Sequence, residues 1–237
     1  MQTINTNVAS LFGQVALNRS ANALLTAQQR LSSGLRINSA KDDATGLATA
    51  STFDMEVRSA NMMARNANNA VSLAQTADGY LAQVQDNTVR LSEIFNQTGA
   101  ITNSEATSLL AENTRLSGLV TASVAVTVDT GGGTAGGAGA TFTSATGFAA
   151  YADFTTEITN IVADRANFGA DIAGLSSAVN GLQIESVNAS ASYSRVMDTD
   201  YAVETTASTK NNILQQAGMA SLAQSNQNPS LVLTLLK

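Results

Sequence analysis

The stretch YADFTTEITNIVADRANFGADIAGLSSAVNGL, residues 151–182, places mostly apolar side chains alternately three and four residues apart. The same register can be followed from Tyr151 to Ala217. Its positions are Phe154, Ile158, Ile161, Arg165, Phe168, Ile172, Leu175, Val179, Leu182, Ser186, Ala189, Tyr193, Val196, Asp200, Val203, Ala207, Lys210, Leu214 and Ala217. One register held over so many steps is typical of a coiled coil. We call such a line of inward positions a seam, and this one predicts long helical rods.

The first half of the chain shows the same spacing in pieces. Leu17, Leu24 and Leu31 lie seven residues apart on a predicted helix that ends at Gly34, which can adopt the left-handed conformation of a helix C-terminus. An irregular joint, LRINSA, follows at residues 35–40, and Asp42 or Asp43 can cap the next helix. That helix, from about 43 to 97, would be roughly 80 Å long.

The middle of the chain is different. A third helix is expected from about Asn103, as N-cap, to Val120, followed by a strand at Ser123–Asp129 and a flexible loop at Gly131–Gly139. The predicted fold is therefore mainly α, with long antiparallel helices forming a coiled coil and a helical bundle and a small irregular or β segment in the middle. The chain would run out and back, so that its two ends lie side by side.

We expect three parts. Residues 1–33 and 204–237 form a terminal coiled coil, residues 34–44 and 191–203 form a joint, and residues 45–190 form a helical bundle with a variable tip at 121–147. The faces beside the terminal seams carry small uncharged residues, namely Ala21, Ala23, Ala27, Ala217, Ala220 and Ala223. A helix that is apolar most of the way round has to be buried. Neighbouring copies of the chain are the expected cover.

Composition argues against an enzyme. The 237 residues include no Cys, no His and no Trp, which removes the commonest general base and the thiolate nucleophile. The pairs Asp42–Asp43 and Asp198–Asp200 are better explained as helix caps than as acid–base catalysts. The run at 131–139 lacks the Lys-Ser/Thr ending of a phosphate-binding loop, and no calcium loop is present. We expect no catalytic residue, no cofactor and no metal site.

Charge and hydropathy exclude two partners. A net charge of −6 without any Lys/Arg cluster disfavours nucleic acid. No run of 18 apolar residues is present, so a membrane span is not expected. The amino terminus, MQTINTNVAS, lacks the basic and apolar regions of a cleaved signal peptide.

The most specific stretch of the sequence is LSSGLRINSAKDDA at residues 31–44. It resembles the hallmark stretch of the bacterial flagellins nearly residue for residue. Other similar stretches, in family order, are NANNAVSLAQ (66–75), SRVMDTDY (194–201), ILQQAG (213–218), LAQSNQ (222–227) and VLTLLK (232–237). The resemblance covers roughly the first hundred and the last fifty to sixty residues. The family's Thr-x-Phe-Asn-Gly motif and its outer domains are missing, which indicates a short form with inner domains only.

The resemblance implies a structural subunit that assembles with copies of itself into the extracellular flagellar filament used for swimming. The terminal coiled coil would form the filament core and LRINSA the spoke. The chain would leave the cell unfolded through the flagellar type III apparatus, without a cleaved signal, after an export chaperone has held its C-terminal segment, here around Gln215–Lys237. Hook-associated and cap proteins would be further partners. The alternative is the related hook–filament junction protein.

The residues expected to contact neighbouring subunits lie in the seams, the joint and the carboxyl end. They are Leu17, Leu24, Leu31, Arg36, Asn38, Lys41, Asp42, Asp43, Ile213, Leu214, Ala217, Leu222, Leu231, Leu235 and Leu236. The family's innate-receptor epitope on the second helix is matched at Arg90 and Gln97, with Ile94 in place of leucine. Its neighbours Leu91, Ser92 and Phe95 differ, so recognition by the Toll-like receptor for flagellin does not follow from the resemblance.

Overall fold

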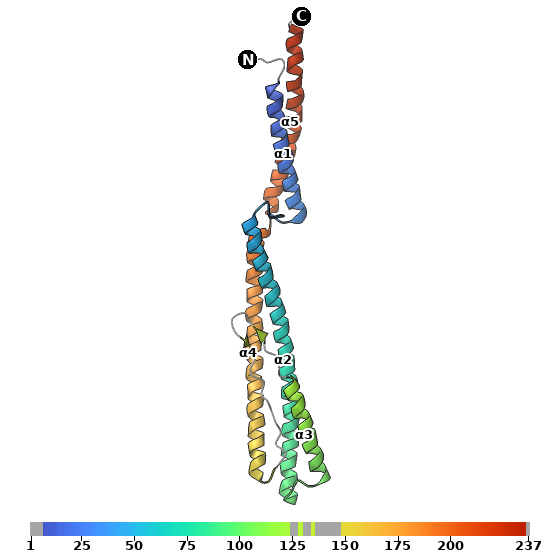
Figure 1. The fold of residues 1–237 in the computed structure, drawn as a ribbon, viewed down its shortest axis with the longest axis vertical. Coiled ribbons are helices and arrows are strands. Elements are labelled where there is room, and N and C mark those ends of the chain that lie inside the picture. The colour runs from blue at the N-terminus through green and yellow to red at the C-terminus, as the bar shows by residue number, and fades with distance from the viewer. Residues whose placement is uncertain (1–6, 124–127, 130–133, 136–147, 236–237) are drawn as a thin grey trace. The chain divides into compact units, whose positions relative to one another are not determined.

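The computed structural model describes residues 7–123, 128–129, 134–135 and 148–235, with side chains for 7–120 and 148–227 (Figure 1). The helices within these ranges are α1 (Val8–Ser33), α2 (Ala44–Thr98), α3 (Ser104–Ser123), α4 (Tyr151–Met197) and α5 (Tyr201–Leu235). The prediction of a mainly α fold of long helices is confirmed. Two units are present: a terminal unit of Met1–Asp54 and Ser190–Lys237, and a bundle unit of Met55–Ala189.

The predicted middle segment is described only in part. Strand β1 (Val128–Asp129) pairs antiparallel with β2 (Thr134–Ala135), and Val128 lies opposite Ala135. Of the strand predicted at Ser123–Asp129, Ser123 belongs instead to α3, and residues 124–127 lie outside the described residues. Apart from Thr134–Ala135, the predicted loop at Gly131–Gly139 also lies outside them.

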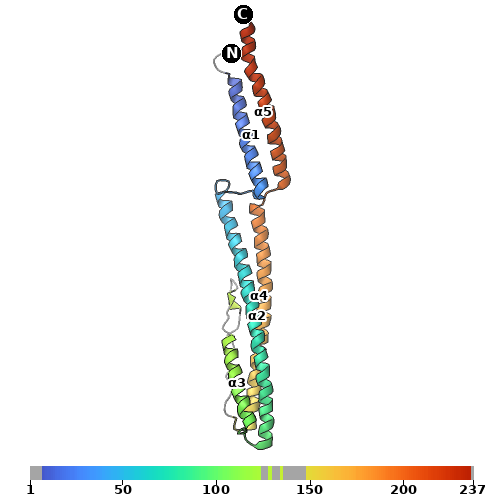
Figure 2. The same ribbon diagram turned by 90° about the vertical axis from the view of Figure 1, so that its right-hand side faces the viewer.

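In the terminal unit, α1 and α5 run antiparallel, side by side (Figures 1 and 2). Asn7 caps α1 by accepting from Ser10 N, and it donates from Nδ2 to the Ser225 carbonyl at 2.9 Å. At the other end of the pair, Arg30 forms an ion pair with Glu204 at 2.8 Å. α1 ends at Gly34 with φ 71°, so the predicted left-handed C-terminus is confirmed.

The α1/α5 interface is narrow, because glycines let leucines approach. A Cβ at Gly13 would lie 2.8 Å from Leu222 Cδ2, and a Cβ at Gly218 would lie 3.2 Å from Leu17 Cδ1. The α1 positions turned toward α5 are spaced three and four residues apart, as the leucines predicted: Ser10, Gly13, Leu17, Leu24, Ala27 and Leu31 are all buried or half-buried.

The single seam predicted from Tyr151 to Ala217 is correct only within α4. There Phe154, Ile161, Phe168, Leu175 and Leu182 are buried as expected. The helix ends at Met197, and after the break the inward positions of α5 come one residue later than predicted. Glu204 is 9% exposed, whereas Val203 is 60% exposed. The α5 seam consists of Glu204, Ser208, Asn211, Gln215, Gly218, Leu222 and Ser225. Residues 198–200, between α4 and α5, are not helical, and they shift the inward-facing positions of α5 by one residue. No periodicity in the sequence marks that shift.

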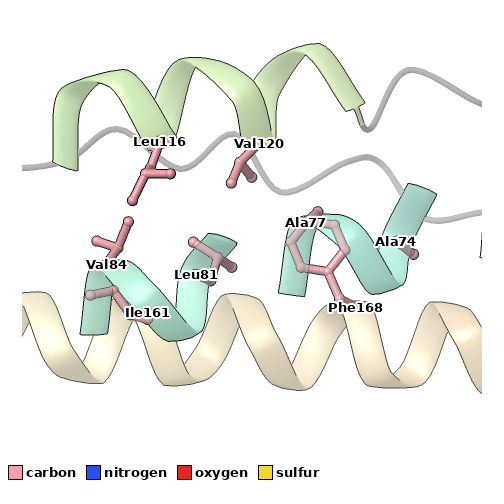
Figure 3. Close-up of a cluster of buried hydrophobic side chains, with 8 residues drawn as sticks. All are labelled: Ala74, Ala77, Leu81, Val84, Leu116, Val120, Ile161 and Phe168. Carbon is pink, nitrogen blue, oxygen red and sulfur yellow. The ribbon is translucent and has the colours of Figure 1, made fainter. Parts of the chain in front are cut away.

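In the bundle unit, α4 lies beside α2, and α3 packs on α2 (Figures 1 and 2). Asn61 on α2 pairs with Ser186 on α4, and Asp78 with Arg165 at 2.8 Å, so these two helices are antiparallel. A cluster of eight buried apolar residues from α2, α3 and α4 forms the central core (Figure 3): Ala74, Ala77, Leu81, Val84, Leu116, Val120, Ile161 and Phe168. Toward the α2–α3 turn a second cluster forms around Phe154, whose ring stacks on Phe148 at 4.3 Å.

Candidate assembly surfaces

The joint is held by backbone hydrogen bonds between two segments far apart in the sequence. Arg36 N donates to the Met197 carbonyl at 2.6 Å, and Thr199 N donates to the Gly34 carbonyl at 3.0 Å. Leu35 and Asp198 form an isolated antiparallel bridge. The chain that leaves α1 is thereby tied to the chain that enters α5.

An apolar cluster fixes the same joint within the terminal unit. Ile37, Ala50 and Met197 are buried, and half-buried residues pack around them: Leu35, Leu47, Tyr193 and Val196. The Arg36 side chain lies outside this cluster and donates from Nη2 to the Val196 carbonyl at 2.7 Å. The predicted contact residue Arg36 is therefore exposed but already held by its own chain.

The two aspartates of the joint accept hydrogen bonds from different groups. Asp43 Oδ1 accepts from Gly46 N at 2.8 Å, so of the two aspartates considered, Asp43 caps α2. Asp42 Oδ2 accepts from Ser39 N, Ser39 Oγ and Asn38 N. These hydrogen bonds, that from Ser39 N foremost, lower the pKa of Asp42.

The joint's remaining polar residues are on the surface. Asn38 donates from Nδ2 to Ser33 Oγ at 2.9 Å, which ties the joint back to the end of α1. Lys41 is exposed. In the second predicted carboxylate pair, Asp200 caps α5 through Ala202 N and Val203 N, while Asp198 accepts from Ser194 Oγ.

The predicted apolar contact residues fall into three groups. Leu17, Leu24, Leu31 and Leu222 are half-buried in the seam between α1 and α5, so their chief neighbours are in the same chain. Ile213, Leu214 and Ala217 lie exposed on α5, outside the seam. Leu231 and Leu235 fall in α5 beyond the described side chains, and Leu236 lies outside the described residues.

A larger apolar surface lies on α1, where sequence reasoning missed it. Val8, Leu11, Phe12 and Val15 are all at least 50% exposed, and Phe12 is 73% exposed. They are spaced i, i+3, i+4 and i+7, so they share the helix face that points away from the seam. That spacing is present in the sequence, but the leucines seven residues apart predict burial of the opposite face. We call these four residues the α1 outer patch.

The rest of this outer face is polar but scarcely charged. Beyond the patch it carries exposed Asn18, Asn22, Thr26 and Gln29. In α1 and in α5 as far as Gln227, the charged residues are Arg19, Arg30, Glu204 and Lys210. Because Arg30 and Glu204 neutralise each other, little charge would have to be desolvated when another helix covers this surface.

The bundle unit also has apolar side chains on its outside. Met55 and Met62 lie exposed, seven residues apart on α2. On α4, Ile184 and Val187 line a shallow groove of about 450 Å³ together with Asn180, Gln183 and Asn188. These positions also escaped sequence reasoning, since they fall between the seam positions of their helices.

Of the three residues predicted as a receptor epitope, Arg90 and Gln97 are exposed and Ile94 is buried. Arg90 forms exposed ion pairs with Glu105 and Glu93, at 2.8 and 2.9 Å. The carboxylates raise the pKa of Arg90, and the arginine lowers the pKa of Glu105. Gln97 is exposed, but Ile94 is buried in the cluster around Phe154. The Ile94 side chain is therefore not accessible beside the other two.

The described residues contain neither a metal site nor a membrane span. No group of three or more acidic side chains there is arranged to hold a metal ion. Among the helices of the described chain, none combines the length and the apolar character that a membrane span requires.

Comparisons with known proteins agree on one family. The model of the bacterial flagellin N-terminal helical region matches residues 4–132, and that of the C-terminal helical region matches residues 152–236. Flagellins of Salmonella rubislaw and Salmonella typhimurium are each 49% identical to this chain over 105 residues, and the flagellin of Escherichia coli K12 is 47% identical. The aligned part is 44% of this chain, and the chain spans about a fifth (21%) of the length of these relatives.

Proposed function

The chain belongs to the bacterial flagellin family, and from this premise we propose that it is a structural subunit of the flagellar filament. In this role it binds further copies of itself and serves swimming motility outside the cell. The matched regions include α1 and α5 of the terminal unit in full.

The observation that supports self-association best is the α1/α5 pair. It is only two helices thick, its α5 seam is largely polar, and its outer face carries the α1 outer patch. Burying a large apolar side chain stabilises an assembly by about 1.5–3 kcal/mol. Four such side chains on a nearly uncharged surface favour association with further copies of the same chain.

We therefore assign the subunit contacts in two groups. The first is the α1 outer patch together with exposed Ile213, Leu214 and Ala217 on α5. The second is the polar surface of the joint, made of Arg36, Asn38, Lys41, Asp42 and Asp43. Leu17, Leu24, Leu31 and Leu222 support both indirectly by holding α1 against α5. Leu231, Leu235 and Leu236 at the carboxyl end remain proposed contacts on their sequence spacing alone.

The same proposal covers the export of the chain from the cell and its other protein partners. It includes export through the flagellar type III apparatus, an export chaperone on the segment around Gln215–Lys237, and hook-associated and cap proteins at the filament's ends. In place of the receptor epitope at Arg90, Ile94 and Gln97, we favour a structural role for Arg90, since its guanidinium links α2 to α3 through Glu105. The hook–filament junction protein is the less favoured alternative, because the relatives named above are flagellins.

The test compares two substitutions on the same face of α1. Phe12→Asp places a charge in the α1 outer patch, whereas Thr26→Asp places it on the polar part of that face, and both positions are exposed in the single chain. We expect Phe12→Asp to raise the critical concentration for seeded polymerisation at least about tenfold, since 1.4 kcal/mol corresponds to a factor of ten. Thr26→Asp should polymerise within about threefold of the parent. Negative-stain microscopy and sedimentation measure this, and parent-like filaments from Phe12→Asp would refute the proposed surface.

A further inference from the structure

The interface between α2 and α3 contains a buried polar layer. Asn87 Nδ2 donates to Asn113 Oδ1 at 2.8 Å, and Asn113 Nδ2 donates to Thr88 Oγ1 at 3.4 Å. Asn113 and Thr88 are fully buried, and Asn87 is nearly so. At the exposed edge of the layer, Gln83 Nε2 donates to Asn87 Oδ1 at 3.0 Å. Among the described residues, no buried side-chain nitrogen or oxygen lacks a hydrogen-bond partner.

Apolar layers lie on both sides of these amides. On one side, Leu116 and Val120 of α3 pack with Leu81 and Val84 of α2 (Figure 3). On the other side, α3 contributes Ala106, with half-buried Leu109 and Leu110, to the cluster that contains Leu91 and Ile94. Without Asn87 and Asn113, both helices would therefore present a continuous apolar repeat to each other.

Such a repeat does not define a single alignment. If α3 slid along α2 by one helical turn, about 5.4 Å, apolar side chains would again meet apolar side chains. The connection does not prevent this, because Thr98 ends α2 and Ser104 begins α3, and the residues 99–103 between them can span such a displacement. The slide would, however, place Asn113 against Leu91 and Asn87 against Leu116. The Asn113 amide and Asn87 Nδ2 would then be buried without a partner, and only the bond from Gln83 to Asn87 Oδ1, within α2, would persist.

We propose that the Asn87–Asn113 pair is a register key, which selects one alignment of α3 on α2 among several that apolar packing alone would allow. A single buried asparagine pair is known to fix register in coiled coils at some cost in stability. The key also determines the outer surface of the bundle unit. In the selected register Glu105 meets Arg90 at 2.8 Å, and a slide of one turn would separate them.

The register can be measured with spin labels, because the chain contains no cysteine. Thr76→Cys and Ser108→Cys place labels on exposed positions of α2 and α3, separated along the helix axis. We expect one distance between the labels in the parent. In Asn87→Leu/Asn113→Leu we expect a second population displaced by about 5 Å, together with a thermal unfolding midpoint no lower than that of the parent.

A second variant relocates the buried asparagine of α2 by one helical turn instead of removing it. Asn87→Leu/Leu91→Asn offers the amide partner of Asn113 one turn further along α2, and the proposal expects the label distance to shift by about one turn. Helix content measured by circular dichroism identifies a variant that fails to fold. Because the two variants differ in their second substitution, the proposal can still be tested with one of them if the other does not fold. A label distance that stays single and at the parent value in either folded variant overturns the proposal.

Discussion

Gly46 lies in the first turn of α2, where the Asp43 carboxylate turns back to cap the helix. A Cβ at this position would collide with that carboxylate and would lie 2.7 Å from Ile37 Cδ1 in the buried cluster of the joint. Gly79, in the middle of the same helix, has open space around it. The two glycines therefore differ in what an alanine side chain would meet, although both are helical.

We expect Gly46→Ala and Gly79→Ala to change stability in opposite directions. Gly79→Ala should stabilise the folded chain by about 0.5–1 kcal/mol, the usual gain from replacing a helical glycine. Gly46→Ala should destabilise it by about 1 kcal/mol or more, because the cap is displaced. Urea unfolding of the monomers measures both changes, and an equal gain for both variants would show that the cap is not needed.

The Asp42 carboxylate gives the joint a dependence on pH. Hydrogen bonds from Ser39 and Asn38 lower its pKa in the folded chain below the ordinary value of 3.8. A lowered pKa contributes stability that is fully present above the pKa of the unfolded chain and is lost as the pH falls through the folded value. We expect Asp42→Asn to be less stable than the parent at pH 7, with the difference shrinking as the pH falls below about 4, the pKa of an aspartate in the unfolded chain. Unfolding midpoints across this range measure it, and a difference that is independent of pH would contradict the assignment.

At the scale of elements, the α1/α5 pair and the bundle helices differ in how much they bury. The core clusters of the bundle unit contain phenylalanine, leucine and isoleucine from three helices. In α1, only Ser10 and Ala27 are buried, and in the described part of α5 only Glu204 is. Two helices joined mainly by polar and small side chains have a low free energy of opening.

We expect amide hydrogen exchange in the monomer to be at least about 100-fold faster in residues 8–33 and 204–227 than in residues 71–94 of α2, which corresponds to about 2.7 kcal/mol. If the proposed assembly forms, exchange in the terminal helices should slow, because neighbouring copies would cover them. Equal protection of both regions in the monomer would show that the α1/α5 pair is stable by itself.

At the scale of the whole molecule, the chain starts and ends in the terminal unit and passes through the bundle unit between. Removing residues 218–237 deletes Gly218, Leu222 and Ser225, which pack against or bond to Leu17, Gly13 and Asn7. The clusters of the bundle unit contain no residue of that segment. The two units should therefore respond differently to this truncation.

We expect the truncated chain to keep a cooperatively unfolding bundle, with its unfolding free energy within about 0.5 kcal/mol of the parent, and to form no filaments when seeded. Thermal unfolding followed by circular dichroism and negative-stain microscopy test the two parts of this expectation. Filaments growing at the parent rate would mean that the carboxyl end is dispensable for assembly.

The sequence alone determined the helical rods, the glycine that ends α1, the cap at Asn103 and the buried face of α4, because these depend on neighbours three and four residues away. It did not determine the seam of α5. There Glu204 turns inward to meet Arg30, while Val203 is exposed. This phase is set by Met197, Asp198 and Thr199, whose backbones bond to the joint more than 160 residues earlier. Only the tertiary structure could place them there, because contacts between distant segments leave no trace in local periodicity.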